Sequence, residues 1–66
     1  MGVNYDNLWK LLIDKNMKRT DLIHEAKISS SALANMGKNN YVSLRIIDKI
    51  CTYLDCNVED ILTIEK

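Results

Sequence analysis

The chain has 66 residues, enough for one small domain over residues 1–66 and too few for a second catalytic lobe. It contains no proline and two glycines, and its Val, Ile, Leu and Met residues recur at helical spacing. This composition favours short packed helices over a sheet. We therefore predict an all-α fold, a compact bundle of about five short helices.

The net charge is zero, which by itself argues against a nucleic-acid partner, because phosphate neutralisation provides most of the sequence-independent affinity. The charges are unevenly distributed, however. Residues 10–49 carry a net charge of +4, whereas residues 1–9 carry −1 and residues 50–66 carry −3. A basic middle and an acidic end suit a domain that binds DNA through one face.

Several other classes of protein lack support in the sequence. The N-terminus has no basic region followed by an apolar run, and no apolar stretch approaches the ~20 residues of a membrane span, so we expect a cytoplasmic protein without membrane contact. Cys51 and Cys56 fit an apolar pattern and, with the distant His24, do not make a zinc site or predict a disulfide. With no phosphate loop, carboxylate pair or nucleophile–base pair, we expect no enzymatic activity, cofactor or small-molecule ligand.

The first helix is predicted at residues 5–15. Asn4 is the expected N-cap, and Leu8, Leu11 and Leu12 lie on the inner face. Trp9 is left open, since it can close the core or lie exposed.

Two short helices joined by a tight connection form the most informative segment. We predict the first at about residues 19–26 and the second at about residues 30–36, where Ser29 is a strong N-cap. With Leu33 and Met36 turned inward, the second helix presents short polar and methyl side chains outward. A DNA major groove admits such a helix and displays base-edge donors, acceptors and thymine methyls.

The remaining chain predicts a loop and two further helices. Gly37 and the residues after it signal a helix end, since Gly supplies a positive φ and Asn tolerates it. Ser43 caps the fourth helix, whose inward residues are Leu44, Ile47, Ile50, Cys51 and Leu54. Asn57 and Asp60 resemble a capping box for a last short helix. In that helix Val58, Ile61 and Leu62 close the core, and residues 63–66 are expected to fray.

The chain resembles the phage-repressor and Cro-like, or XRE-like, helix-turn-helix family over nearly its whole length. The pattern lies in Asp21-Leu22-Ile23, Ala26-Lys27-Ile28-Ser29, Leu33 and Met36, and continues from Ser43-Leu44 to Ile61-Leu62. The resemblance implies a lambda-repressor-like fold and a transcriptional regulator, a repressor, whose recognition helix is the one at residues 30–36. It also implies a homodimer on double-stranded DNA with a palindromic operator.

The resemblance further implies which residues contact DNA. Base edges would face Ser30, Ser31 and Asn35, and thymine methyls or the groove wall would lie near Ala32 and Ala34. Phosphate contacts would come from the start of the second helix, the cap of the third and the loop after it, namely Lys18, Arg19, Thr20, Ser29, Lys38, Asn39 and Asn40.

The sequence departs from the family pattern in three places. Lys27 occupies a turn position where the family usually has Gly, so a residue with a Cβ must adopt that backbone. Leu12 and Gly37 stand where many members have an Arg and a Glu that pair. The recognition helix has no Arg, Lys or Gln, which leaves Asn35 as the one bidentate reader of adenine.

Two alternatives follow from the surface. Ile46, Tyr53 and Ile64 lie off the inward stripes, so they form either a self-association patch or scattered surface hydrophobes. The zero net charge and the Ser/Ala composition of the third helix also permit another class of function, a helix-turn-helix fold used as a protein–protein interaction module without DNA binding.

Overall fold

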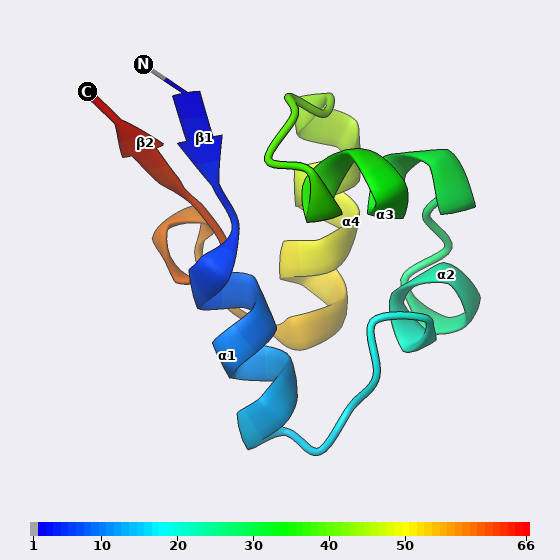
Figure 1. Cartoon of the computed structure of the whole chain (residues 1–66). Coiled ribbons are helices and arrows are strands. Elements are labelled where there is room, and N and C mark those ends of the chain that lie inside the picture. The colour runs from blue at the N-terminus through cyan, green and yellow to red at the C-terminus, as the bar shows by residue number, and fades with distance from the viewer. Residues whose placement is uncertain (1) are drawn as a thin grey trace.

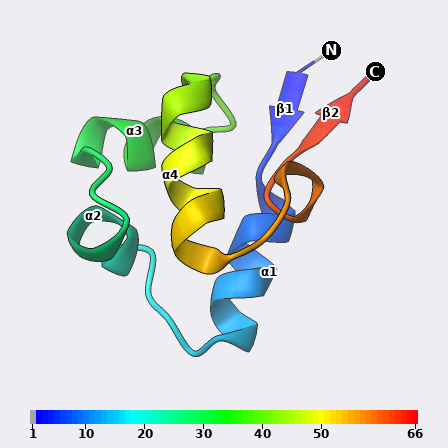
Figure 2. The same cartoon turned by 180° about the vertical axis from the view of Figure 1, so that it is seen from behind.

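A computed structural model describes residues 2–66 (Figure 1). In chain order the elements are β1 (Gly2–Asn4), α1 (Asp6–Asp14), α2 (Asp21–Glu25), α3 (Ser30–Gly37), α4 (Leu44–Leu54), the 3₁₀ turn η1 (Val58–Asp60) and β2 (Thr63–Glu65). The predicted helical bundle is confirmed, with four α-helices and one 3₁₀ turn in place of five helices. Seen from either side, α4 lies between the α2–α3 pair and the side formed by α1 and the strands (Figures 1 and 2).

The two ends of the chain pair with each other, which corrects the expectation that residues 63–66 fray. Strands β1 and β2 are antiparallel, with Val3 opposite Ile64. Val3 is buried, and the Leu8 amide of α1 donates to the Ile61 carbonyl at 3.1 Å, which brings the last residues beside the first. A three-residue strand is too short to show an alternating pattern, and its partner is at the other end of the sequence.

Helix α1 begins one residue later than predicted. Tyr5 occupies the N-cap position and Asp6 is the first helical residue. Asn4 lies further out, and its Oδ1 accepts a hydrogen bond from the Asp6 amide at 2.7 Å. Asn4 therefore satisfies a first-turn N–H group as a cap would, but through a turn that precedes the helix.

One hydrophobic core joins all the helices. Its buried residues are Val3, Tyr5, Leu8, Leu12, Leu22, Ala26, Ile28, Ala32, Met36, Ile47, Ile50, Leu54 and Ile61. Two residues that we expected inside are exposed instead, Leu44 by 80% and Val58 by 45%. Each is the first residue of its element, where the chain is still at the surface of the bundle.

The structure shows the exposure of the apolar residues for which the sequence left two alternatives. Trp9 and Ile46 are half-buried against the core, whereas Tyr53 and Ile64 are exposed by 40% and 58%. Within residues 2–66 no helix is long and apolar enough to cross a membrane.

Four residues with a side chain adopt the left-handed backbone region, and each follows a helix: Asn16, Lys27, Asn39 and Asp55. Asn and Asp tolerate this region, but Lys27, at φ 61°, has no such advantage. The turn conformation predicted for Lys27 is thus confirmed. The Lys27 carbonyl accepts a hydrogen bond from Lys49 Nζ at 3.2 Å, which ties the turn to α4.

Helix α4 ends in a turn that brings two cysteines together. Asp55 is left-handed, and the Cys56 amide donates to the Cys51 carbonyl at 3.1 Å, the pattern in which the residue after the turn packs on the last helical turn. Cys51 and Cys56 make this contact, and both are half-buried. The predicted capping box follows, with the Asn57 amide donating to Asp60 Oδ2 at 3.0 Å.

We expect Lys27→Gly to stabilise the protein by about 0.5–1 kcal/mol, because the strain relieved at a left-handed residue exceeds the entropy that glycine adds to the unfolded chain. Urea denaturation at neutral pH measures the change. Lys27→Ala is the matched control, since it removes the charge but keeps the Cβ. Equal stability of the two variants would contradict backbone strain at Lys27.

We expect the two thiols to make stability fall as the pH rises from about 9 to 11. Burial and the neighbouring Cys51 raise the pKa of the Cys56 thiol from 9.0 to about 11, and burial also raises the pKa of Cys51. A raised pKa favours folding while the group is protonated, so this contribution is complete below pH 9 and is lost through pH 11. The free energy of unfolding in reducing buffer should therefore fall less steeply over this range in Cys51→Ala/Cys56→Ala. Parallel pH dependences in the two proteins would contradict this prediction.

Candidate nucleic-acid interface

Helices α2 and α3 contact each other across a short connection. Lys27 turns the chain, and the Ile28 amide donates to the Leu22 carbonyl at 3.5 Å. The cap predicted at Ser29 is confirmed, because its Oγ accepts from the Ala32 amide at 3.1 Å. The helix-turn-helix geometry is therefore fixed by hydrogen bonds at both ends of the connection.

Helix α3 buries one narrow stripe and exposes the rest. Met36 is completely buried and Leu33 is half-buried. Ala32 is buried as well, at 7% exposure, so the expectation that it faces a base is wrong. Ala32 lies one helical turn before Met36, and residues four apart share a helix face. The exposed residues that remain from the predicted base-contacting set are Ser30, Ser31, Ala34 and Asn35.

The loop after α3 is held by the core. Gly37 is the last residue of the helix and has no positive φ, so the left-handed residue that turns the chain is Asn39 and not Gly37 as expected. The hydroxyl of the buried Tyr5 donates to the Asn40 carbonyl at 2.8 Å, and the backbone amide of Tyr5 donates to Asn39 Oδ1 at 3.4 Å. Burial raises the pKa of this hydroxyl, so Tyr5 stays a neutral donor at physiological pH.

Asn35 is oriented by the same loop. The backbone N–H of Asn40 donates to the backbone carbonyl of Asn35 at 2.8 Å. Between the side chains, Asn40 Nδ2 donates to Asn35 Oδ1 at 3.4 Å. The second bond leaves the Asn35 Nδ2 group and one acceptor site of its Oδ1 unused. Asn35 thus projects an amide whose direction is set by a neighbouring side chain.

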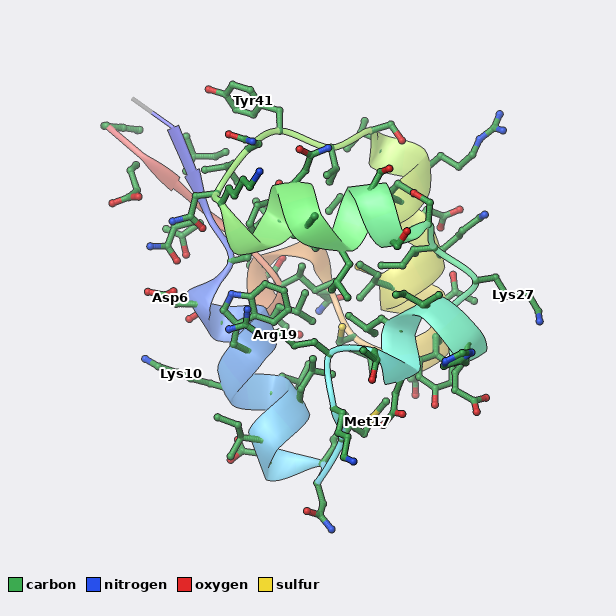
Figure 3. All side chains as sticks on the ribbon, turned by 45° about the vertical axis from the view of Figure 1, so that its right-hand side comes forward. Asp6, Lys10, Met17, Arg19, Lys27 and Tyr41 are labelled. Carbon is green, nitrogen blue, oxygen red and sulfur yellow. The ribbon has the colours of Figure 1, made fainter. Side chains whose placement is uncertain are left out.

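Exposed side chains lie on both long sides of α3 (Figure 3). On one side Arg19 lies near the C-terminal half of α3, and its guanidinium carbon is 3.9 Å from the centre of the Trp9 ring. On the other side Tyr41 projects from the loop, with 74% of its surface exposed. Lys18, Thr20 and Lys38 are also exposed.

Sequence reasoning missed two residues of this surface, Trp9 and Tyr41. The sequence did not decide whether Trp9 is in the core or at the surface. Helical periodicity does not show that a cation from the next segment covers the Trp9 ring. Tyr41 directly follows the predicted phosphate-contacting loop, and that position was the available signal.

The acidic end of the chain lies away from α3. Glu59 and Asp60 belong to η1, which packs on α1, and Glu65 belongs to β2, which pairs with β1. Among residues 2–66 no three His, Cys, Asp or Glu side chains gather where they could hold a metal ion.

The arrangement of two short helices around a left-handed turn, with a capped and outward-facing second helix, defines a helix-turn-helix domain. The chain belongs to the family of Cro/C1-type HTH DNA-binding domains, which matches it over residues 7–66. The family resemblance seen in the sequence is thereby confirmed.

A solved structure has the same fold over most of the chain. The crystal structure of the transcriptional regulator VanUg, form II, is similar with a TM-score of 0.91 and 45% sequence identity. The similarity covers 94% of this chain and 83% of the VanUg chain. No curated protein matches the chain in sequence.

We expect Gly37→Ala to stabilise the protein by about 0.5–1 kcal/mol, because alanine favours the helical conformation that Gly37 already has. The new Cβ would meet one neighbour, Arg19 Nη1 at 3.8 Å, which is ordinary van der Waals contact. Thermal or urea unfolding measures the effect. Destabilisation by Gly37→Ala would contradict a helical conformation at Gly37. It would instead support the positive φ that the sequence led us to expect at this residue.

Proposed function

We propose that the protein is a sequence-specific DNA-binding transcriptional regulator, a repressor, which inserts α3 into the major groove. The observation that carries the proposal is the exposed strip of α3 between two flanks rich in phosphate-binding groups. A helix in the major groove has a phosphate backbone on each side, so donors are needed on both flanks.

Base recognition is assigned to the exposed residues of α3. Asn35 has the amide that pairs with the N6 and N7 positions of adenine, and the Ser30 and Ser31 hydroxyls can donate to or accept from base edges. Ala34 offers a methyl group to thymine. These short side chains make few strong contacts, so DNA shape contributes to the sequence preference.

Phosphate binding is assigned to the two flanks. Lys18, Arg19 and Thr20 serve one backbone, and the loop of Lys38, Asn39 and Asn40 serves the other. Asn39 uses its Oδ1 for Tyr5, which leaves its Nδ2 as a donor for a phosphate. Tyr41 adds an exposed hydroxyl to this flank. The exposed Ser29 adds a hydroxyl at the start of α3, although that oxygen already accepts from Ala32.

We propose that two copies bind a palindromic operator. One domain of this size makes a small interface, and a dimer reads two half-sites about one helical turn apart. The exposed Tyr53 and Ile64 are candidates for the contact between copies. Selection of bound sequences from a random DNA pool should therefore return an inverted repeat.

The decisive measurement is the salt dependence of binding to the selected DNA. We expect Arg19→Ala/Lys38→Ala to reduce the slope of log affinity against log salt by about 2 for each copy bound, and so by about 4 for two copies on the palindromic site, because each phosphate contact releases about one counterion. Asn35→Ala should instead keep the slope and weaken preference at one position per half-site, by about 1–3 kcal/mol.

Lys10→Ala/Lys15→Ala is the matched control, since it removes two positive charges from another face. Lys10 lines a hollow with Cys56 and Glu59, and Lys15 lies close enough to lower the pKa of Cys56. The salt slope of Lys10→Ala/Lys15→Ala should differ less from that of the wild type than the salt slope of Arg19→Ala/Lys38→Ala does.

A second candidate function is a protein–protein interaction module that keeps the fold without binding DNA. It is favoured by the zero net charge and by the exposed apolar side chains. If the protein does not bind duplex DNA, or if its affinity for duplex DNA does not fall as the salt concentration rises, the interaction module is the better description of its function.

A further inference from the structure

Arg19 and Trp9 form a contact between two elements that are separate in the sequence. Trp9 lies on α1 and is half-buried against the core, and Arg19 precedes α2 and is exposed. The guanidinium carbon is 3.9 Å from the ring centre, so the planar cation lies over the indole face. Trp is the aromatic side chain that attracts a cation most strongly.

The end of α3 leaves space for the same guanidinium. A Cβ at Gly37 would lie 3.8 Å from Arg19 Nη1, the one heavy atom within 4 Å apart from the adjacent residues and the backbone of the same helix. A long side chain at this residue would compete with the guanidinium for the space. Arg19 is therefore bounded by Trp9 and by the C-terminal end of α3.

The hydrogen-bonding edge of Arg19 remains available. Stacking uses the flat face of the guanidinium and leaves its N–H groups in the plane. None of the side-chain hydrogen bonds within residues 2–66 has the Arg19 guanidinium as its donor. Such a planar, exposed edge matches two oxygens of a phosphate.

We propose that Trp9 is a positioning residue for DNA binding, which holds the Arg19 guanidinium beside the end of α3 so that it donates to a phosphate diester of the DNA backbone. This proposal rests on the proposed function. Trp9 itself need not touch DNA. Its contribution is to reduce the side-chain freedom that Arg19 would otherwise lose on binding.

A double-mutant cycle on duplex DNA tests the proposal. For each copy bound, Trp9→Leu should weaken binding about threefold to fivefold, the size of an exposed cation–π contact, and Trp9→Phe should recover part of the loss. Arg19→Ala should weaken binding further and lower the salt slope by about 1 per copy. Because Trp9 acts through Arg19, Trp9→Leu should cause no further loss in an Arg19→Ala background.

Arg19→Lys separates charge from stacking. Lysine keeps the positive charge but has no planar group, so Arg19→Lys should weaken binding as Trp9→Leu does. Trp9 is the only tryptophan, so its fluorescence reports the contact in the free protein. Arg19→Ala should change the emission, whereas Lys38→Ala should not. Circular dichroism and urea unfolding check that each variant is folded at the temperature of the binding assay.

Four results would overturn the proposal. The first is unchanged binding by a folded Trp9→Leu variant while Arg19→Ala binds more weakly, which would leave the proposed function intact. The second is independent losses of affinity for Trp9→Leu and Arg19→Ala, and the third is a Trp9 emission that does not respond to Arg19→Ala. The fourth is a wild-type protein with no salt-dependent affinity for duplex DNA, which would overturn this proposal and the proposed function together.

Discussion

The complete burial of Met36 is the constraint on which the interface depends. Helix α3 has eight residues, and an isolated helix of that length is not stable in water. It is held by the stripe of Ala32 and Met36 against the core, and this stripe decides which of its residues face outward. The exposed strip of α3 is therefore a consequence of core packing. A completely buried side chain therefore sets which residues of α3 are exposed.

Backbone conformation fixes α3 at its two ends. Lys27 and Asn39 are both left-handed, and the segment between them contains the whole helix. At the far end the Tyr5 hydroxyl donates to the Asn40 carbonyl, so the residue that precedes α1 supports the loop that follows α3. Asn40 in turn orients Asn35. This series of contacts runs from the buried phenol to an exposed amide, and it gives a short polar side chain a defined direction without any charge.

The neutral net charge is compatible with a local cationic surface. The acidic residues of η1 and β2 pack beside α1 and β1, whereas the Arg19 guanidinium lies between α1 and the C-terminal end of α3. Stacking on Trp9 keeps this cation at a defined place at little cost in buried charge, because the guanidinium edge stays in water. The positions of a few charges matter more for binding through one face than their sum over the chain.

The sequence by itself determined the helices, the caps at Ser29 and Ser43 and the capping box, because these depend on residues within a few positions of each other, and the family resemblance implied the left-handed turn at Lys27. Only the tertiary structure decided the pairing of β1 with β2, the burial of Ala32, the helical state of Gly37 and the contact of Arg19 with Trp9. Each of these joins segments far apart in the chain or depends on how a helix is rotated against its neighbours. The periodicity of the sequence predicts only approximately which side of a helix is buried. The packing of the helix against its neighbours decides its rotation about its own axis, and so which residues are buried.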